Sequence, residues 1–286
     1  FRSATKREFD EDKDPSKKYI TSRWEELWKE DVFRSRWVLR DFAKTKGEGD
    51  FFNPTPSKAA SELVHIRALE KGHTIRYFDC SRAFPHAPEL ESIYTNTPEG
   101  YEDTYGPMVK TLRKINGRRD GSQAFGEWLD TQLTHMKFQS NPLEPCLFYS
   151  ASRDISVSTH VDDGCTEGSP IELDKFFDEL GKIVLLKVTG ELNPDGTHDD
   201  VKVKFLGRLR TREGDVIRRY VDPKYVNECV ALLGLENANP VPTPSTKLLK
   251  QKEGDNDLDK SDHSRYRTCV GKLLHCHEDY VGAQYV

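Results

Sequence analysis

Ser158-Thr159-His160-Val161-Asp162-Asp163-Gly164 is the most informative segment of this chain, because it ends a β-prone run with an acidic pair. Between Ile155 and Val161, apolar residues alternate with smaller or polar ones, which predicts a half-buried strand that ends at the acidic pair. An earlier β-prone run, Thr74-Ile75-Arg76-Tyr77-Phe78, predicts a second strand with Asp79 at its carboxyl end. The sequence therefore predicts that Asp79, Asp162 and Asp163 lie at the ends of two strands.

Carboxylates at strand ends, with no Cys or His near them in ligand spacing, suit a hard, oxygen-preferring cation rather than zinc. Three such acids can hold two Mg²⁺ ions, with Mn²⁺ as a substitute. Two ions of this kind can activate a 3′-hydroxyl and stabilise a pyrophosphate leaving group. Taken alone, however, Asp162-Asp163 is more often an ordinary turn pair, and the motifs around it decide between the two interpretations.

Several collinear motifs resemble those of copia-type LTR-retrotransposon reverse transcriptases. Phe78-Asp79-Cys80-Ser81-Arg82-Ala83-Phe84 resembles their first catalytic motif, and His160-Val161-Asp162-Asp163 resembles their Tyr-Val-Asp-Asp box. The resemblance covers roughly residues 31 to 286. The remaining matching segments are Phe33 to Arg40, Asn53 to Ser57, Leu112 to Gly117, Ala124-Phe125, Phe205-Leu206-Gly207, Pro242-Thr243-Pro244 and Tyr266 to Leu274.

Three positions depart from the family pattern. His160 replaces the box tyrosine, Asp120 stands near the family's Gln, and Ser122 replaces a proline. Asp120 brings a negative charge close to the expected place of an incoming nucleotide, which weakens nucleotide binding unless Arg118 or Arg119 neutralises it.

The resemblance implies an α+β fold of the right-hand polymerase type, with fingers, palm and thumb and a split βαβ, ferredoxin-like palm. We expect an N-terminal tail and helix in residues 1–30, fingers in 31–73, a palm in 74–215 with a fingers insertion near 87–122, and the start of a thumb or connection in 216–286.

Local patterns predict the elements of this fold. Residues 1–20 are charged and predict a loose tail, and Trp24, Leu27 and Trp28 have the spacing of an amphipathic helix over Ser22 to Val32. A helix over Pro56 to Glu70, capped by Ser57, is expected to bury Ala60, Leu63, Val64 and Ala68. Further helices are predicted at Ser81 to Phe84 after the Asp79 strand, Gln123 to Met136, Ile171 to Leu180 and Tyr225 to Leu233.

The resemblance also implies roles for individual residues. Phe84 would be an aromatic gate that rejects a 2′-hydroxyl, and a core phenylalanine is the alternative. Arg36 and Arg40 would bind the triphosphate of a dNTP beside Asp120, and surface charge is the alternative. Phe205-Leu206-Gly207 would belong to a hairpin that positions the primer end. Lys187 is either a proton donor to pyrophosphate or, as we favour, an exposed lysine.

Charge is unevenly distributed along the 286 residues, whose formal net charge is -5. One basic cluster is expected to contact the primer and template: Lys110, Arg113, Lys114, Arg118 and Arg119. Another cluster, Arg208 to Arg219, can equally be a solvated face. Non-specific affinity for nucleic acid comes largely from such cations, so an acidic chain needs them concentrated.

Six scattered cysteines and the absence of an apolar segment of membrane-spanning length predict a reduced, intracellular setting. The resemblance implies a cytoplasmic virus-like particle or the nucleus. It also implies a Pol polyprotein that carries integrase and ribonuclease H regions beside this segment, with an RNA or DNA template, its primer and dNTPs as partners.

We therefore expect an RNA- and DNA-templated DNA polymerase that uses Asp79, Asp162 and Asp163. One alternative is a catalytically decayed, retrotransposon-derived remnant that only binds nucleic acid, an interpretation sustained by His160 and Asp120. Another is a metal-dependent phosphoesterase that uses the same acids on water. Such an enzyme needs neither the aromatic gate at Phe84 nor the hairpin at Gly207.

Overall fold

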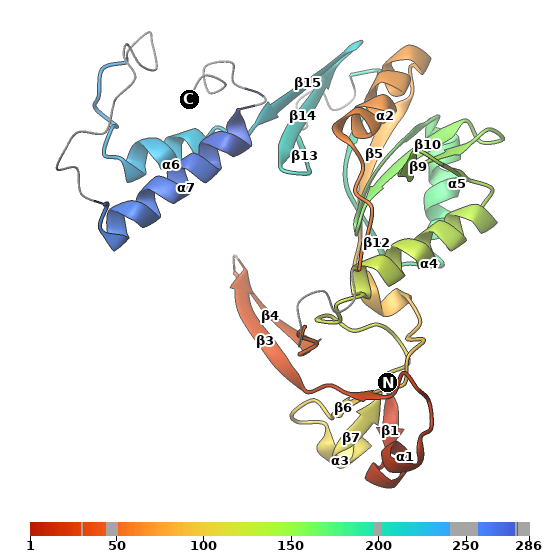
Figure 1. Cartoon of the computed structure of the whole chain (residues 1–286). Coiled ribbons are helices and arrows are strands. Elements are labelled where there is room, and N and C mark those ends of the chain that lie inside the picture. Colours follow the sequence, from red (N-terminus) through yellow and green to blue (C-terminus); the bar gives the residue numbers. More distant parts are fainter. Residues whose placement is uncertain (30, 44–50, 197–201, 241–256, 278, 280–286) are drawn as a thin grey trace. The chain divides into compact units, whose positions relative to one another are not determined.

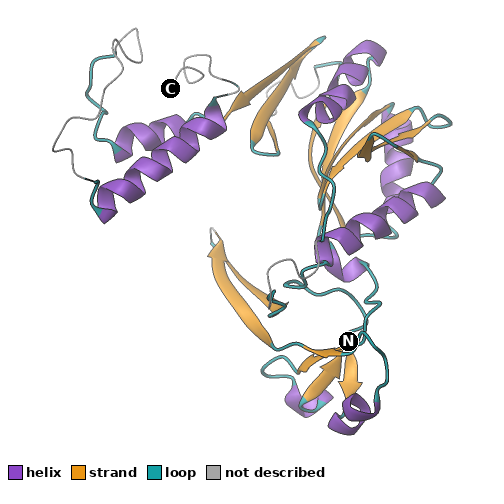
Figure 2. Cartoon of the chain, viewed as in Figure 1, coloured by secondary structure: helices purple, strands orange, loops and turns teal. Residues whose placement is uncertain are grey.

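The computed structural model describes residues 1–29, 31–43, 51–196, 202–240, 257–277 and 279. Helices and strands are mixed along the chain, so the expected α+β class is confirmed (Figure 2). The chain forms two compact units, Phe1–Thr197 and His198–Val286. The Pro242-Thr243-Pro244 landmark lies outside the described residues. Among the described helices, none has the length and apolar character needed to cross a bilayer.

The centre of the first unit is a six-stranded antiparallel sheet in the order β12-β5-β11-β10-β9-β8 (Figure 1). Its strands are β5 (Thr74–Cys80), β8 (Gln139–Asn141), β9 (Glu144–Ser150), β10 (Ile155–His160), β11 (Asp163–Gly168) and β12 (Leu186–Leu192). The strands predicted before Asp79 and before Asp162 are thus confirmed, and both lie near the middle of the sheet.

Helices cover both faces of this sheet. On one face, α4 (Gly121–His135) and α5 (Pro170–Leu180) bury Phe125, Leu129, Leu173 and Phe176 in a core that includes Phe78. The other face carries α2 (Lys58–Lys71) (Figure 1). Since both faces are covered, β10 is buried throughout its apolar length, and the prediction of a half-buried strand was wrong.

The predicted helices are largely confirmed. The Ser57 hydroxyl caps α2 by accepting the Ala60 N–H at 3.1 Å. Ala60, Val64 and Ala68 are buried as expected, but Leu63 is 51% exposed and faces away from the sheet. After Asp79 the chain makes only a 3₁₀ turn, η1 (Phe84–His86), in place of the expected helix.

The order of elements in the main sheet is strand, helix, hairpin, helix, strand. Along the chain, β5 is followed by α4, the β10–β11 hairpin, α5 and β12, and in space these strands lie in the order β12-β5-β11-β10. This is a β-α-β-β-α-β arrangement with β8 and β9 added at one edge. It brings the end of β5 beside the turn between β10 and β11.

The N-terminal residues belong to a second, four-stranded sheet, β1-β7-β6-β2. Its strands are β1 (Arg2–Ala4), β2 (Lys18–Tyr19), β6 (Ile93–Asn96) and β7 (Met108–Lys110), with α1 (Lys6–Glu11) and α3 (Glu102–Tyr105) beside them. The prediction of a loose tail over residues 1–20 was therefore wrong. Tail charges are fixed here by specific partners: Asp12 accepts hydrogen bonds from the Tyr94 hydroxyl at 2.7 Å and from Lys110 at 3.2 Å.

The helix predicted over Ser22 to Val32 is also absent. β3 (Ser22–Lys29) pairs along its whole length with β4 (Val32–Leu39), and this ribbon joins no other strand of the described chain. Trp24 and Trp28 are four residues apart, a spacing that places them on one face of a helix and equally on one face of a strand. Pairing with Trp37 and Phe33 decides for the strand.

The second unit contains a three-stranded sheet and two helices. The strands are β13 (Val203–Phe205), β14 (Arg208–Glu213) and β15 (Val216–Val221), and the helices are α6 (Lys224–Leu232) and α7 (Lys260–Cys276). The helix predicted over Tyr225 to Leu233 is confirmed by α6. The palm boundary expected between residues 215 and 216 falls in the turn between β14 and β15, so it cuts this sheet.

Candidate active site

The register of the central strands brings the three predicted acids to one end of the sheet. Asp79, near the end of β5, lies directly opposite Asp163, the first residue of β11. Asp162 lies in the two-residue turn that joins β10 to β11, and its carbonyl accepts the Cys80 N–H at 2.7 Å. Directly opposed side chains on antiparallel strands share one face, so Asp79 and Asp163 project together.

The turn that carries Asp162 has an unusual backbone. Val161 has φ +57°, in the left-handed region that β-branched residues rarely adopt. Such a conformation costs on the order of 1–3 kcal/mol and persists where the surroundings determine it. Here the paired strands on either side hold the turn, since His160 lies opposite Asp163.

Like charges concentrate at this edge. Burial, together with the neighbouring Asp162 and Asp79, raises the pKa of the Asp163 carboxyl. Burial and the same three acids raise the pKa of the Cys80 thiol to about 12. Asp79 accepts a hydrogen bond from the Ser81 hydroxyl at 2.9 Å, which fixes its orientation. Burial and neighbouring like charges raise the pKa of Asp163, and a cation bound beside this carboxylate would stabilise its charged form.

A tighter group of acids lies elsewhere. In the described part of the chain, the three acids with ligand atoms within 4.8 Å of one another are Glu89, Glu91 and Asp120. This group is neutralised from within the chain: Lys114 donates to Glu89 at 2.7 Å and Arg118 donates to Glu91 at 2.6 Å. It is therefore an ion-pair cluster. Asp79, Asp162 and Asp163 are spaced more widely, and among the described residues no Lys or Arg forms an ion pair with them. His160 is the neighbour that opposes the rise in the pKa of Asp163.

The same cluster contains Asp120, whose negative charge it neutralises. Both Lys114 and Arg118 donate hydrogen bonds to its Oδ2, and Arg118 also donates to Asp41 at 2.9 Å. Of the two arginines considered as partners of Asp120, Arg118 is the one that pairs with it, at 3.1 Å. Lys114 and Arg118 are, however, only 3% and 5% exposed. Lys114 and Arg118 therefore cannot contact a primer or template as expected, because their charges are paired with carboxylates inside the fold.

The other three cations of the basic cluster differ in exposure. Lys110 is paired with Asp12 at 3.2 Å, and the Arg119 guanidinium lies 5.2 Å from the Phe51 ring centre. Arg113 is exposed and donates to the His86 carbonyl at 2.7 Å. Arg113 is therefore the member of this cluster that the fold presents most openly to solvent.

Arg36 and Arg40 come together at the end of β4. They line a hollow of about 250 Å³ with Asn116 and Gly117. Gly117 has φ +87°, and a Cβ there would lie 2.1 Å from the Leu39 carbonyl oxygen. A glycine is thus required for this loop to approach β4 and close the hollow.

Phe84 and the Phe205-Leu206-Gly207 segment occupy defined positions. The Phe84 ring is half-buried against the core and packs on α4, where a Cβ on Gly121 would lie 3.0 Å from it. Phe205-Leu206-Gly207 forms the turn from β13 to β14, with Leu206 at φ +47° and Gly207 at φ +74°. The predicted hairpin is confirmed as a structure within the second unit.

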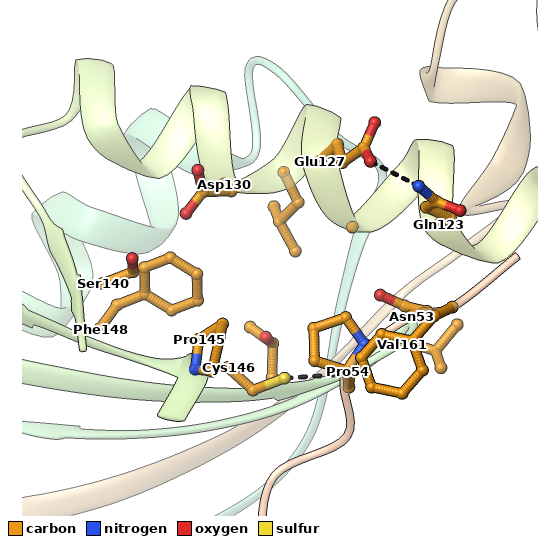
Figure 3. A pocket seen from close by; sticks show the side chains of 14 residues that line it. Asn53, Pro54, Gln123, Glu127, Asp130, Ser140, Pro145, Cys146, Phe148 and Val161 are labelled. Carbon is orange, nitrogen blue, oxygen red and sulfur yellow. Dashed lines mark hydrogen bonds between the residues drawn. The ribbon is translucent and has the colours of Figure 1, made fainter. Parts of the chain in front are cut away.

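The sequence analysis did not predict a pocket that lies beside the Val161 turn. It has a volume of about 240 Å³ and lies between α4, the β8–β9 edge and the segment around Pro54 (Figure 3). Cys146 Sγ donates to the Pro54 carbonyl at 3.0 Å and closes one wall. The sequence contains one signal for this pocket, a glycine inside a helix. A Cβ at Gly126 would lie 2.5 Å from Asn53 Oδ1, so the glycine allows Asn53 to approach α4 closely.

The structure also gives the position of Lys187, which the periodicity of the sequence could not predict. It is exposed, as favoured, and lies on the edge strand β12 directly opposite Asp79. The register therefore places Lys187 at the same end of the sheet as the three acids.

No protein-family model matches this chain, and no curated protein matches its sequence.

Proposed function

We propose that this chain is a reverse transcriptase, an RNA- and DNA-templated DNA polymerase of the right-hand type that acts in LTR-retrotransposon replication. The observation that carries the proposal is the pairing of Asp79 with Asp163, with Asp162 in the adjoining turn, at one end of a β-α-β-β-α-β sheet. Three carboxylates in this setting suit nucleotidyl transfer.

Asp79, Asp162 and Asp163 would hold two Mg²⁺ ions. When bound, these ions would lower the pKa of the primer 3′-hydroxyl and neutralise charge on the α-phosphate and the leaving pyrophosphate. The residues fit such ions, because burial and mutual repulsion already raise the pKa of Asp163 and the described chain supplies no ion-pair partner to the three acids.

The chain's own residues would orient the substrates. Arg36 and Arg40 line one hollow and can donate to a triphosphate. The Phe84 ring, held by α4 through Gly121, would contact the sugar. Asp120 would not repel the nucleotide, since Lys114 and Arg118 neutralise it. Phe205-Leu206-Gly207 would hold the primer end.

The same proposal names partners and setting. A primed RNA or DNA template and dNTPs would be the substrates, and integrase and ribonuclease H regions of one Pol polyprotein would act beside this segment, in a virus-like particle or the nucleus. These follow from the motif resemblance.

Primer extension tests the proposal. The wild-type chain and Asp162→Asn would be compared on a poly(rA) template with an oligo(dT) primer, dTTP and Mg²⁺, and Asp130→Asn, an acid on α4 outside the triad, would be the control. We expect extension by the wild type and the control and its loss in Asp162→Asn. Equal extension by all three would refute the proposal.

The two rival functions give different results in the same assay. A catalytically decayed remnant would bind the primer–template and extend nothing, and Asp162→Asn would bind as the wild type does. A metal-dependent phosphoesterase would shorten the primer and release nucleotides in the absence of dTTP, and Asp162→Asn would stop that release.

A further inference from the structure

His86 contacts several segments at the end of the sheet that carries the three acids. It is the last residue of η1, and its ring stacks on Trp128 of α4, with ring centres 5.6 Å apart and planes at 18°. Its carbonyl accepts a hydrogen bond from Arg113, in the linker between β7 and α4, at 2.7 Å. Its ring nitrogen Nε2 lies 3.3 Å from the Ser81 carbonyl oxygen and 3.4 Å from the Leu185 backbone nitrogen.

The His86 ring takes the place of one hydrogen bond between β5 and β12. The last pair of these strands is Cys80 with Leu186, so Ser81 and Leu185 are the next residues to face each other. The Ser81 N–H donates to the Leu185 carbonyl at 2.7 Å. A regular antiparallel pair would return a bond from the Leu185 N–H to the Ser81 carbonyl. Here the His86 Nε2 lies between these two groups.

Either neutral form of the ring satisfies one of the two backbone groups. With its proton on Nδ1, the ring accepts the Leu185 N–H at Nε2. With its proton on Nε2, the ring donates to the Ser81 carbonyl. The ring therefore holds the chain where β5 has ended and regular pairing has stopped.

Ser81 connects this arrangement to the acids. Its hydroxyl donates to Asp79 Oδ2 at 2.9 Å, and Asp79 lies opposite Asp163. The Ser81 backbone is held by Leu185 at its N–H and lies against His86 at its carbonyl. Contacts on both sides of the residue limit the directions that its hydroxyl can take.

We propose that His86 is a positioning residue for Asp79 and acts on it through Ser81. The ring fixes the residue that follows β5, so that the Ser81 hydroxyl holds Oδ2 and leaves Oδ1 for a divalent cation. This role lies outside the three acids and adds to the proposed polymerase chemistry. Its effect on the extension rate rests on the proposed function, whereas its effect on cation binding does not. The competing explanation is that His86 only fills space against Trp128.

Two substitutions separate the ring nitrogen from the stacking. His86→Phe keeps a ring against Trp128 and removes the nitrogen. His86→Gln removes the ring and places an amide of similar reach, which can both accept and donate, near Ser81 and Leu185. The matched control is His135→Phe, the same change at an exposed histidine at the end of α4.

Mn²⁺ affinity, measured from the electron paramagnetic resonance signal of the free ion, is the first readout. We expect His86→Phe to weaken Mn²⁺ binding about tenfold, which is the lower end of the effects of outer-shell partners at metal sites. His86→Gln and His135→Phe should stay within about twofold of the wild type, because the first keeps the hydrogen bonds and the second lies away from the acids.

A double-mutant cycle tests the route through Ser81. Ser81→Ala removes the hydroxyl that holds Asp79, and we expect it to weaken Mn²⁺ binding about tenfold by itself. Adding His86→Phe to Ser81→Ala should weaken binding by no more than about a further twofold, because residues that act through one contact are not additive.

Single-turnover extension gives the readout that rests on the proposed function. At saturating primer–template, His86→Phe should incorporate the first nucleotide about tenfold more slowly, and His86→Gln should recover most of the rate. The affinity for primer–template should be the same in all of these variants, because the ring acts on Asp79 and touches no nucleic acid.

Several outcomes would overturn the inference. These are wild-type Mn²⁺ affinity in His86→Phe or in Ser81→Ala, a loss in His86→Gln as large as that in His86→Phe, or full additivity in the double variant. Ser81→Ala leaves the His86 ring in place, so it decides the matter even if His86→Phe does not fold. A wild type that binds Mn²⁺ and extends no primer would refute the polymerase alone, and a wild type that does not bind Mn²⁺ would refute both proposals.

Discussion

The charge of Asp163 lowers the stability of the folded chain. Its pKa is raised by burial and by Asp162 and Asp79, so keeping the carboxylate charged destabilises the folded chain. Between the ordinary value of 3.8 and the raised value, the folded state holds this proton more tightly than the unfolded state does. The free energy of unfolding therefore falls as pH rises through the folded pKa.

Because the charged Asp163 carboxylate destabilises the fold, replacing it with a neutral residue should stabilise the chain at neutral pH. Asp163→Asn should raise the melting temperature at pH 7 without metal, because it removes a like charge from the acidic edge. At pH 3, where the carboxyl is protonated in both states, the two proteins should melt together. Added Mg²⁺ should stabilise the wild type more than the variant. Calorimetry at both pH values, with and without Mg²⁺, measures all three effects, and a lower melting temperature for Asp163→Asn at pH 7 would contradict this electrostatic account.

Val161 stores strain at the same edge. Asn tolerates a positive φ far better than a β-branched residue, so Val161→Asn should stabilise the fold by about 1 kcal/mol. It should also slow primer extension, since the turn positions Asp162. Lys137, an exposed residue at φ +69°, provides the control.

For this control, Lys137→Asn should give a similar gain in stability with unchanged extension. Urea unfolding and the extension assay report the two quantities separately. If Val161→Asn extends primers as fast as Lys137→Asn, the strained turn has no part in the chemistry.

At the scale of elements, the linker from β7 to α4 is held by a buried ion-pair cluster. Arg118 contacts Asp41, Glu91 and Asp120, and the Glu89 carboxylate beside it is fully buried. We expect Arg118→Ala to cost about 3–5 kcal/mol, because it leaves buried carboxylates without their cation.

Arg113→Ala is the matched comparison for Arg118→Ala. Arg113 is exposed in the same linker, so its loss should change stability by no more than about 0.5 kcal/mol and lower affinity for nucleic acid instead. Urea unfolding and oligonucleotide anisotropy distinguish the two variants. Equal losses of stability would show that the cluster does not hold the linker.

Elements with one clear apolar stripe could be predicted from the sequence, and those built by pairing could not. The α2 helix follows from the Ser57 cap and the spacing of Ala60, Val64 and Ala68. The β3 strand does not, because the spacing of Trp24 and Trp28 fits a helix and a strand alike. Only pairing with β4 decides, and pairing is not a local property of sequence.

At the scale of the whole molecule, the sequence predicted that the three acids lie at strand ends, whereas the strand register that brings them together could not be predicted from it. Asp79 and Asp163 meet because β5 pairs with β11, a register that no periodicity reveals. The burial of Arg118 was not predictable either, because its partners Asp41 and Glu91 lie far from it in sequence. The division into Phe1–Thr197 and His198–Val286 likewise depends on which strands share a sheet.

The net charge of the whole chain is -5, which opposes the binding of nucleic acid. With Lys114 and Arg118 of the basic cluster buried, the proposed contact with nucleic acid would rest on fewer, exposed groups such as Arg113. Affinity for a primer–template should therefore fall with salt, and comparisons of activity are meaningful only at equal occupancy of the substrate.

The most direct measurement is the rate of first-nucleotide incorporation at saturating primer–template, for the wild type, Asp162→Asn and Asp130→Asn. The central claim is that the acids at the end of β5 and in the β10–β11 turn perform nucleotidyl transfer. We expect Asp130→Asn to match the wild type and Asp162→Asn to be slower by at least about 100-fold, because several kcal/mol of transition-state stabilisation are lost. Incorporation by Asp162→Asn at the wild-type rate would contradict the claim.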